Sequence, residues 1–248
     1  MLSSGLARRC VGVVLMAGLS SGCSAFAKKK ECKTLLDDVN RNGSAIKQIE
    51  KSNDPRKVAG SARSTAAIAS QLASDVSGRA FRLSELKQFA RDYASFANQA
   101  ASGMNEMAKV MDQFADLKDQ VDDASSTSPA KKFVSATQKF ADTCRARPSA
   151  GCVGIAKVIQ GLPKKGEDMD AYARGLDSAS ADMKRVPHEA GLNTVVDDLV
   201  RQTAELGKVF RGIADATRKL KTTQAELDTT LAREKPLNAS INAFCQVR

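Results

Sequence analysis

Tryptophan is absent from this chain of 248 residues, tyrosine occurs twice and histidine once. Long stretches in which apolar and polar residues alternate with a period of two are also missing, which excludes a protein built mainly of β-strands. The scarcity of aromatic side chains removes the stacking platforms on which single-stranded nucleic acids bind. His188 has no serine or cysteine nucleophile with an acid partner that can be placed around it. We therefore expect an all-α protein that is neither an enzyme nor a nucleic-acid binder.

Apolar runs long enough to cross a bilayer, which takes roughly 20 residues, are missing too. The longest run extends from Cys10 to Leu19 and follows Arg8 and Arg9. A positive region followed by a short apolar run is typical of a signal peptide. We predict that residues 1–22 are a targeting signal and that the mature chain has no membrane-spanning helix.

A short motif follows this apolar run, with the sequence Leu-Ser-Ser-Gly-Cys at residues 19–23. It resembles the lipobox of bacterial lipoproteins, although Ser20 stands where leucine is typical. The resemblance implies that Cys23 becomes the first residue, carries acyl chains and anchors the protein, and that Ser24 permits sorting to the outer membrane. In a competing interpretation, ordinary signal peptidase cleaves after Ala27 and releases a secreted or periplasmic protein.

Four cysteines remain in the mature chain beyond Cys23: Cys32, Cys144, Cys152 and Cys245. An even number in an exported chain indicates two disulfides, for which three pairings exist. Cys144 and Cys152 bracket a short loop, and Cys32 and Cys245 lie near the two ends, so we predict these two pairs. A metal site is disfavoured, because the cysteines do not form a Cys-x-x-Cys pair and the chain has a single histidine. We expect no metal and no cofactor.

Positive charge exceeds negative charge, with a formal net charge of +10 that becomes +8 when Arg8 and Arg9 are removed with the signal. A basic exported protein attracts anionic headgroups, lipopolysaccharide or acidic polymers. The densest cluster lies beside the predicted anchor and consists of Lys28, Lys29, Lys30 and Lys33. Each such charge contributes about 1 kcal/mol at an anionic bilayer surface. We predict that this cluster contacts anionic lipid or an envelope polymer.

The residues from Leu83 to Val121 follow an uninterrupted heptad with apolar or small side chains in four of its seven columns. The two core columns are Leu83, Ala90, Ala97, Met104, Met111, Lys118 and Leu86, Tyr93, Ala100, Met107, Phe114, Val121. So broad a stripe predicts a helix that packs against at least two neighbours. A second heptad runs from Leu192 to Leu231, which supplies a partner helix within the same chain.

We predict that residues 33–248 form one all-α domain, an elongated antiparallel helical bundle whose spine is these two helices, preceded by a lipidated basic tether at 23–32. Shorter helices are expected at 33–51, 58–76, 131–143, 153–162 and 169–186, and the last long segment at 188–235. The two heptads also fit an internal duplication with a break near 124–130. Two unrelated core helices of one bundle are the simpler interpretation.

Remaining candidates for chemistry have ordinary explanations. The acidic pairs Asp37-Asp38, Asp122-Asp123 and Asp197-Asp198 point about 100° apart on a helix and are expected to be solvated. Met104, Met107 and Met111 either line an adaptable pocket or pack in the core. The sequence thus predicts a monomeric, non-catalytic envelope lipoprotein that acts as an adaptor or binding module toward an unidentified protein partner. The alternative is a membrane-active or lipid-carrying helical protein, similar to pore-formers.

Overall fold

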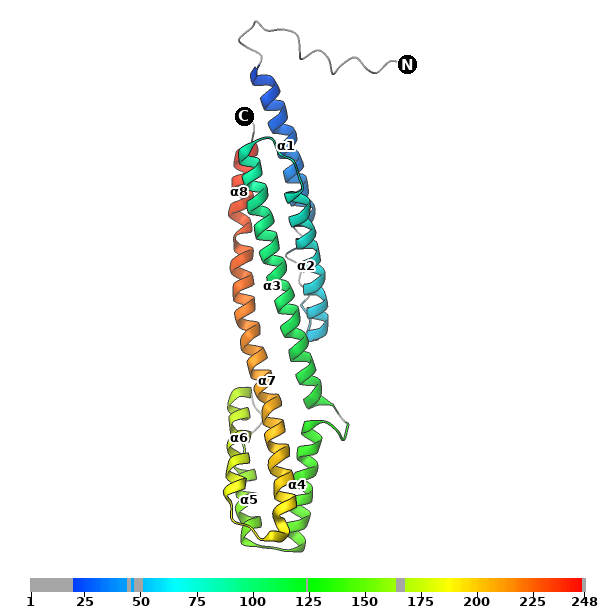
Figure 1. Cartoon of the computed structure of the whole chain (residues 1–248), viewed down its shortest axis with the longest axis vertical. Coiled ribbons are helices and arrows are strands. Elements are labelled where there is room, and N and C mark those ends of the chain that lie inside the picture. The colour runs from blue at the N-terminus through cyan, green and yellow to red at the C-terminus, as the bar shows by residue number, and fades with distance from the viewer. Residues whose placement is uncertain (1–19, 44–45, 47–50, 124, 164–167, 247–248) are drawn as a thin grey trace, which may run out of the picture. The chain divides into compact units, whose positions relative to one another are not determined.

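The computed structural model describes residues 20–43, 46, 51–123, 125–163 and 168–246. This part of the chain is helical and contains no β-strand. The elements are α1 (Ser20–Gly43), α2 (Pro55–Ser77), α3 (Ser84–Asp122), α4 (Pro129–Ala146), α5 (Ala150–Gln160), α6 (Met169–Arg185), the 3₁₀ turn η2 (Ala190–Leu192), α7 (Asn193–Ala232) and α8 (Glu234–Cys245) (Figure 1). The predicted all-α helical bundle is confirmed.

Contacts between Cα atoms divide the chain into two compact units. The first comprises Met1–Gln48, Thr65–Ala101 and Thr229–Arg248, and the second comprises Ile49–Ser64 and Ser102–Asp228. Helix α3 therefore contributes 84–101 to the first unit and 102–122 to the second. The link between α3 and α4, where the duplication hypothesis places its break, lies inside the second unit. The duplication itself stays a prediction.

Within the second unit, α3 and α7 pack antiparallel. A Cβ atom built on Gly103 of α3 would lie 3.2 Å from Leu227 of α7, whereas one built on Gly212 of α7 would lie 3.0 Å from Leu117 of α3. Between these points, Lys219 Nζ lies 2.5 Å from Glu106 Oε1. Positions that run forward along α3 thus meet positions that run backward along α7, in agreement with the predicted antiparallel pairing of the two heptad helices.

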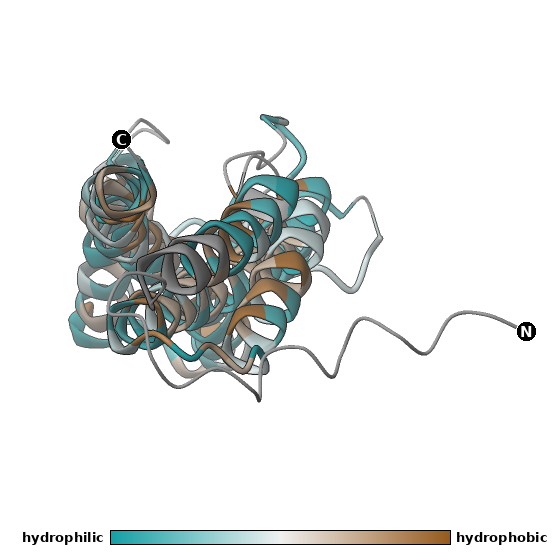
Figure 2. Cartoon of the chain, turned by 90° about the horizontal axis from the view of Figure 1, so that it is seen from above, coloured by the Kyte–Doolittle hydropathy of each residue, from teal (hydrophilic) through white to brown (hydrophobic). Residues whose placement is uncertain are grey.

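Most of the predicted heptad core is buried. Along single helices, hydrophilic and hydrophobic residues lie on different sides of the axis (Figure 2). The buried positions are Leu86, Ala90, Tyr93, Ala97, Ala100, Met104 and Met107 of α3, together with Leu192, Val196, Leu199, Thr203, Leu206, Phe210, Ile213 and Leu227 of the second heptad. Thr203 is the polar member of this buried set, whereas the longer polar side chains at core positions of the two heptads, Lys118 and Gln224, are exposed.

Small side chains form the contact between α2 and α3 in the second unit. Ala59 and Ala62 pack on Ala108, with Met111 against this cluster. Arg56 at the start of α2 binds the carboxylates of Asp116 and Asp119 at 2.9 and 2.6 Å. Met104 and Met107 are buried and Met111 is partly buried against the alanine cluster, so the three methionines pack between helices.

Several predicted helix boundaries differ from the structure, most clearly those of the first and the last long helix. Helix α1 begins at Ser20 rather than at Lys33 and ends at Gly43, because alanine, lysine and glutamate, all strong helix formers, dominate residues 25–31. The last long helix begins at Asn193, after η2, rather than at His188. Residues 1–19 of the predicted signal lie outside the described residues. No helix among the residues described is both long and apolar enough to cross a membrane.

Candidate functional site

The first unit contains the disulfide between Cys32 of α1 and Cys245 of α8. Their Cα atoms lie 5.5 Å apart, and 213 residues separate them in sequence. The Cys32 side chain is buried, and α1 contacts α8 around this bridge. The predicted disulfide between Cys32 and Cys245 is therefore present in the structure.

Next to the bridge, the ring of Phe244 connects the basic cluster to the bundle. Lys28 Nζ lies 4.2 Å from the Phe244 ring centroid, a cation–π geometry. The Phe244 ring also packs against Phe89 of α3 in an edge-to-face arrangement, with 5.6 Å between the ring centroids. Lys29, Lys30 and Lys33 are exposed instead. The four predicted lysines thus separate into one that is held against an aromatic ring and three that face solvent.

An ion pair between a buried carboxylate and a half-exposed guanidinium joins α1 to the link between α2 and α3. Arg79 donates from Nε and Nη2 to both carboxylate oxygens of Asp38, at 2.8 and 3.0 Å. Asp38 is only 2% exposed, so the prediction that its acidic pair is solvated is wrong for this residue, although Asp37 is exposed. The Asp38 carboxylate raises the pKa of the Arg79 guanidinium above its usual value. The bidentate geometry fixes Arg79 in place.

A second carboxylate on α1 binds the backbone of the same link. Glu31 accepts hydrogen bonds from the backbone N–H of Arg82, at 3.1 and 3.0 Å, and of Leu83, at 3.2 Å. These donors precede α3, so Glu31 supplies the negative charge that a helix N-terminus favours. Ser84, the first residue of α3, donates its hydroxyl to the Glu85 carboxylate. A backbone hydrogen bond, and secondarily the Ser84 hydroxyl, lower the pKa of the Glu85 carboxyl below its usual value. Both interactions involve only neighbouring residues of α3.

Between α1 and this link lies a pocket of about 370 Å³. One wall is a single face of α1, and the other is the link that carries Arg79. The lining residues are Ala27, Lys30, Glu31, Thr34, Arg79, Ala80, Phe81 and Arg82. Three are cationic and one is acidic, so the pocket suits an anion. Sequence patterns identified Lys30 but not Arg79 and Arg82. The signal that could have revealed them is the presence of two arginines in one short link between helices.

A polar group also lies in the core of the first unit, at the start of α8. Tyr93 of α3 is fully buried, and no described residue lies in hydrogen-bonding geometry to its hydroxyl. Glu234, also buried, and Asn238 approach it from α8, where Asn238 Nδ2 donates to Glu234 Oε1 at 3.4 Å. Burial, and secondarily the charge of Glu234, raise the pKa of the Tyr93 phenol well above its ordinary value.

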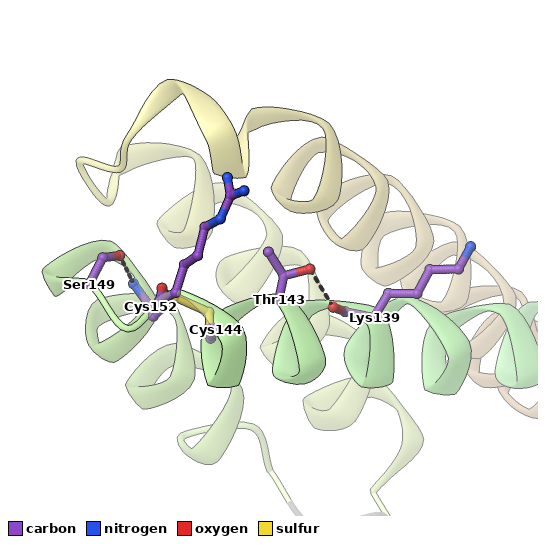
Figure 3. The surroundings of a disulfide bond; sticks show 6 residues. Lys139, Thr143, Cys144, Ser149 and Cys152 are labelled. Carbon is purple, nitrogen blue, oxygen red and sulfur yellow. Dashed lines mark hydrogen bonds between the residues drawn. A yellow bond between two sulfur atoms is a disulfide. The ribbon is translucent and has the colours of Figure 1, made fainter.

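The second predicted disulfide, Cys144–Cys152, joins α4 to α5 in the second unit, with 5.7 Å between Cα atoms (Figure 3). Ser149 caps α5 by accepting a hydrogen bond from the Cys152 N–H at 3.3 Å. On α4, Thr143 donates to the Lys139 carbonyl at 2.8 Å. The bridge therefore closes the turn between two adjacent helices, as the spacing predicts.

Other candidate residues have structural roles. His188 Nδ1 lies 2.7 Å from the Val186 carbonyl oxygen, next to the α5 helix. Asp122, Asp123 and Asp197 are exposed, whereas Asp198 binds Arg201 and Gln202 along its own helix. Across the described ranges, no three histidine, cysteine or acidic side chains are grouped to hold a metal ion.

Cys23, the predicted lipidation site, belongs to α1, but its side chain lies outside the described part of the structure. Comparison of the chain with protein-family models, with curated proteins and with solved structures finds no match. The site is therefore interpreted from its own residues.

Proposed function

We propose that this chain is an exported lipoprotein of the cell envelope, anchored through acyl chains on Cys23, that acts without catalysis as a helical adaptor or binding module. The two disulfides support export, because such bonds persist in oxidising compartments. The outer membrane is the proposed location, and an unidentified envelope protein the proposed partner of the monomer.

The continuity of α1 is the observation that carries this proposal. One helix contains Cys23, the exposed Lys29, Lys30 and Lys33, and the bridged Cys32. An acyl chain on Cys23 would therefore attach to a rigid element that is covalently joined to α8. Basic side chains one to three turns along the same helix then lie close to an anionic surface.

Metabolic labelling with a palmitate analogue tests the anchor. The wild-type chain should incorporate the label into its N-terminal peptide, and Cys23→Ala should abolish incorporation. Cys10→Ala is the matched control, because that cysteine lies in the signal and should leave labelling unchanged. Mass spectrometry that finds an unmodified N-terminus at Lys28 would instead establish ordinary cleavage after Ala27 and overturn the lipoprotein proposal.

Crosslinking in the native envelope tests the adaptor role. A photo-crosslinking residue placed at exposed positions of α4 and α5, such as Val134 and Val153, should capture a discrete envelope protein. These are the large apolar side chains with the greatest exposure, 61% and 58%, among those described. Capture of lipid alone at every position would contradict the adaptor role.

The alternative function, a membrane-active protein, is favoured by the alanine contact between α2 and α3 in the second unit. Small side chains contribute little to each contact, so such helices separate more easily than leucine-packed ones. Release of trapped dye from liposomes by the purified protein would support this alternative, and intact liposomes would support the adaptor.

A further inference from the structure

We propose that the pocket between α1 and the α2–α3 link binds the phosphate group of an anionic phospholipid headgroup. This inference rests on the proposed function, because it needs the pocket to face a membrane. It goes beyond general attraction of the lysine cluster, since it assigns binding to particular side chains.

The pocket presents three cations, and within the part of the chain that the structure describes two of them, Lys30 and Arg82, make no side-chain hydrogen bond or ion pair. Arg79 has two of its donor atoms on Asp38, which leaves the remaining guanidinium N–H donors for a ligand and holds the group in one orientation. Lys30 and Arg82 are exposed on opposite walls of the pocket. A phosphate group held between the two walls would accept charge-assisted hydrogen bonds, which are stronger than neutral ones.

The acidic groups nearby are already satisfied. Glu31, the one carboxylate among the lining residues, accepts hydrogen bonds from the Arg82 and Leu83 backbone. Asp38 is buried beneath Arg79. Both carboxylates therefore orient the cationic link, and among the lining residues three cations face one carboxylate.

The other lining residues fit a lipid better than a free phosphate ion. Ala27, Ala80 and Phe81 contribute an apolar part of the wall, against which glycerol and the first methylenes of a lipid can pack. Residues 27, 30, 31 and 34 share one face of α1. Cys23 lies one turn before Ala27 in the same helix, about 6 Å along its axis. A lipidated Cys23 would thus bring the pocket to headgroup level.

Calorimetric titration of the full chain, purified in neutral detergent, with short-chain phosphatidic acid tests this proposal. We expect saturable binding to the wild-type chain, weakened about tenfold or more in Arg82→Ala and in Lys30→Ala. Lys29→Ala is the matched control, because it removes the same charge from the neighbouring residue, which does not line the pocket; its affinity should stay within about twofold. Short-chain phosphatidylcholine should bind at least tenfold more weakly.

Three outcomes would overturn the assignment. Equal losses in Lys29→Ala and Lys30→Ala would show diffuse surface attraction. Inorganic phosphate that binds as tightly as phosphatidic acid would make the free ion the ligand. Absence of saturable binding to the wild type would remove the site. Because none of these measurements depends on acyl chains, palmitate labelling at Cys23 can succeed while the pocket fails, and the reverse also holds.

Discussion

The backbone of His188 lies so close to Gly151 that only a hydrogen atom fits between them. A Cβ atom built on Gly151 would lie 2.7 Å from His188 Cβ and 2.9 Å from its Cα. Gly154, one turn later in α5, lies against the side chain of Val186, whose Cγ1 would be 2.6 Å from a Cβ atom built on the glycine. These two glycines let the segment between α6 and η2 pack directly on α5.

Gly151→Ala should therefore destabilise the protein by about 1–3 kcal/mol, as overpacking typically does, because the obstructing atoms include backbone. Gly60→Ala on α2 is the matched control. A Cβ there meets nothing within 4 Å, so alanine should stabilise the helix by about 0.5–1 kcal/mol. Urea unfolding measures both values. A stabilising effect of Gly151→Ala would contradict the packing described.

The two disulfides should differ in their contribution to stability. The Cys32–Cys245 bridge spans 213 residues and the Cys144–Cys152 bridge spans 8. Loop-closure entropy gives about 5 kcal/mol for the first and about 2.5 kcal/mol for the second. Paired Cys→Ala variants, unfolded in urea without reductant, should follow this order. Peptide mapping without reduction checks the pairing, and free thiols at Cys32 and Cys245 would exclude the long bridge.

Tyr93→Phe should leave stability within about 1 kcal/mol of wild type, because it removes a hydroxyl that has no well-placed partner. Tyr93→Ala should cost about 3–5 kcal/mol through the cavity that it creates. A loss above 2 kcal/mol in Tyr93→Phe, again by urea unfolding, would mean that the hydroxyl is well bonded.

The same residue predicts a dependence on alkaline pH. The folded-state pKa of Tyr93 is raised above its unfolded value of about 10, so the folded chain retains this proton longer. Its contribution to stability is complete below about pH 10 and is lost as pH rises toward the folded-state pKa. Between about pH 9 and 11, the Tyr93→Phe variant should therefore lose less stability than the wild-type protein loses. Tyrosinate absorbance gives a second check, because Tyr172, whose pKa burial also raises, is the only other tyrosine.

Arg79→Ala should lower the thermal midpoint more than Arg82→Ala, since only the first leaves the carboxylate of Asp38 buried and unpaired. Adding Asp38→Ala to Arg79→Ala should restore part of the loss. Thermal unfolding of the wild type, the two single variants at Arg79 and Asp38, and the double variant forms a double-mutant cycle that measures this coupling. Independent, additive effects of the two changes would show that the pair does not stabilise the fold.

The elements that sequence reasoning predicted well are those in which local pattern dominates. The heptad of 83–121 matches α3 to within one residue at each end, because burial of one helix face repeats along the chain. The start of α1 was missed, since lysine and alanine form helix without marking an apolar face.

The pairing of Asp38 with Arg79 was not predictable from local pattern. An aspartate beside another aspartate on a helix indicates a solvated face, and only the tertiary arrangement brings Arg79 to it across 41 positions of sequence. The pocket depends on the same arrangement. Its cations come from two separate segments, so the lysine cluster of 28–33 indicated charge but not a binding geometry.

The Cys32–Cys245 bridge makes a closed covalent ring of nearly the whole described chain. A protease that cuts once at any exposed link within the ring, such as the one between α3 and α4, produces two fragments that remain one molecule. Cleavage by an envelope protease would therefore release nothing until a reductant opened the bridge. A single nick is visible only on a reducing gel, and protease sensitivity measured without reduction underestimates how often the chain has been cut.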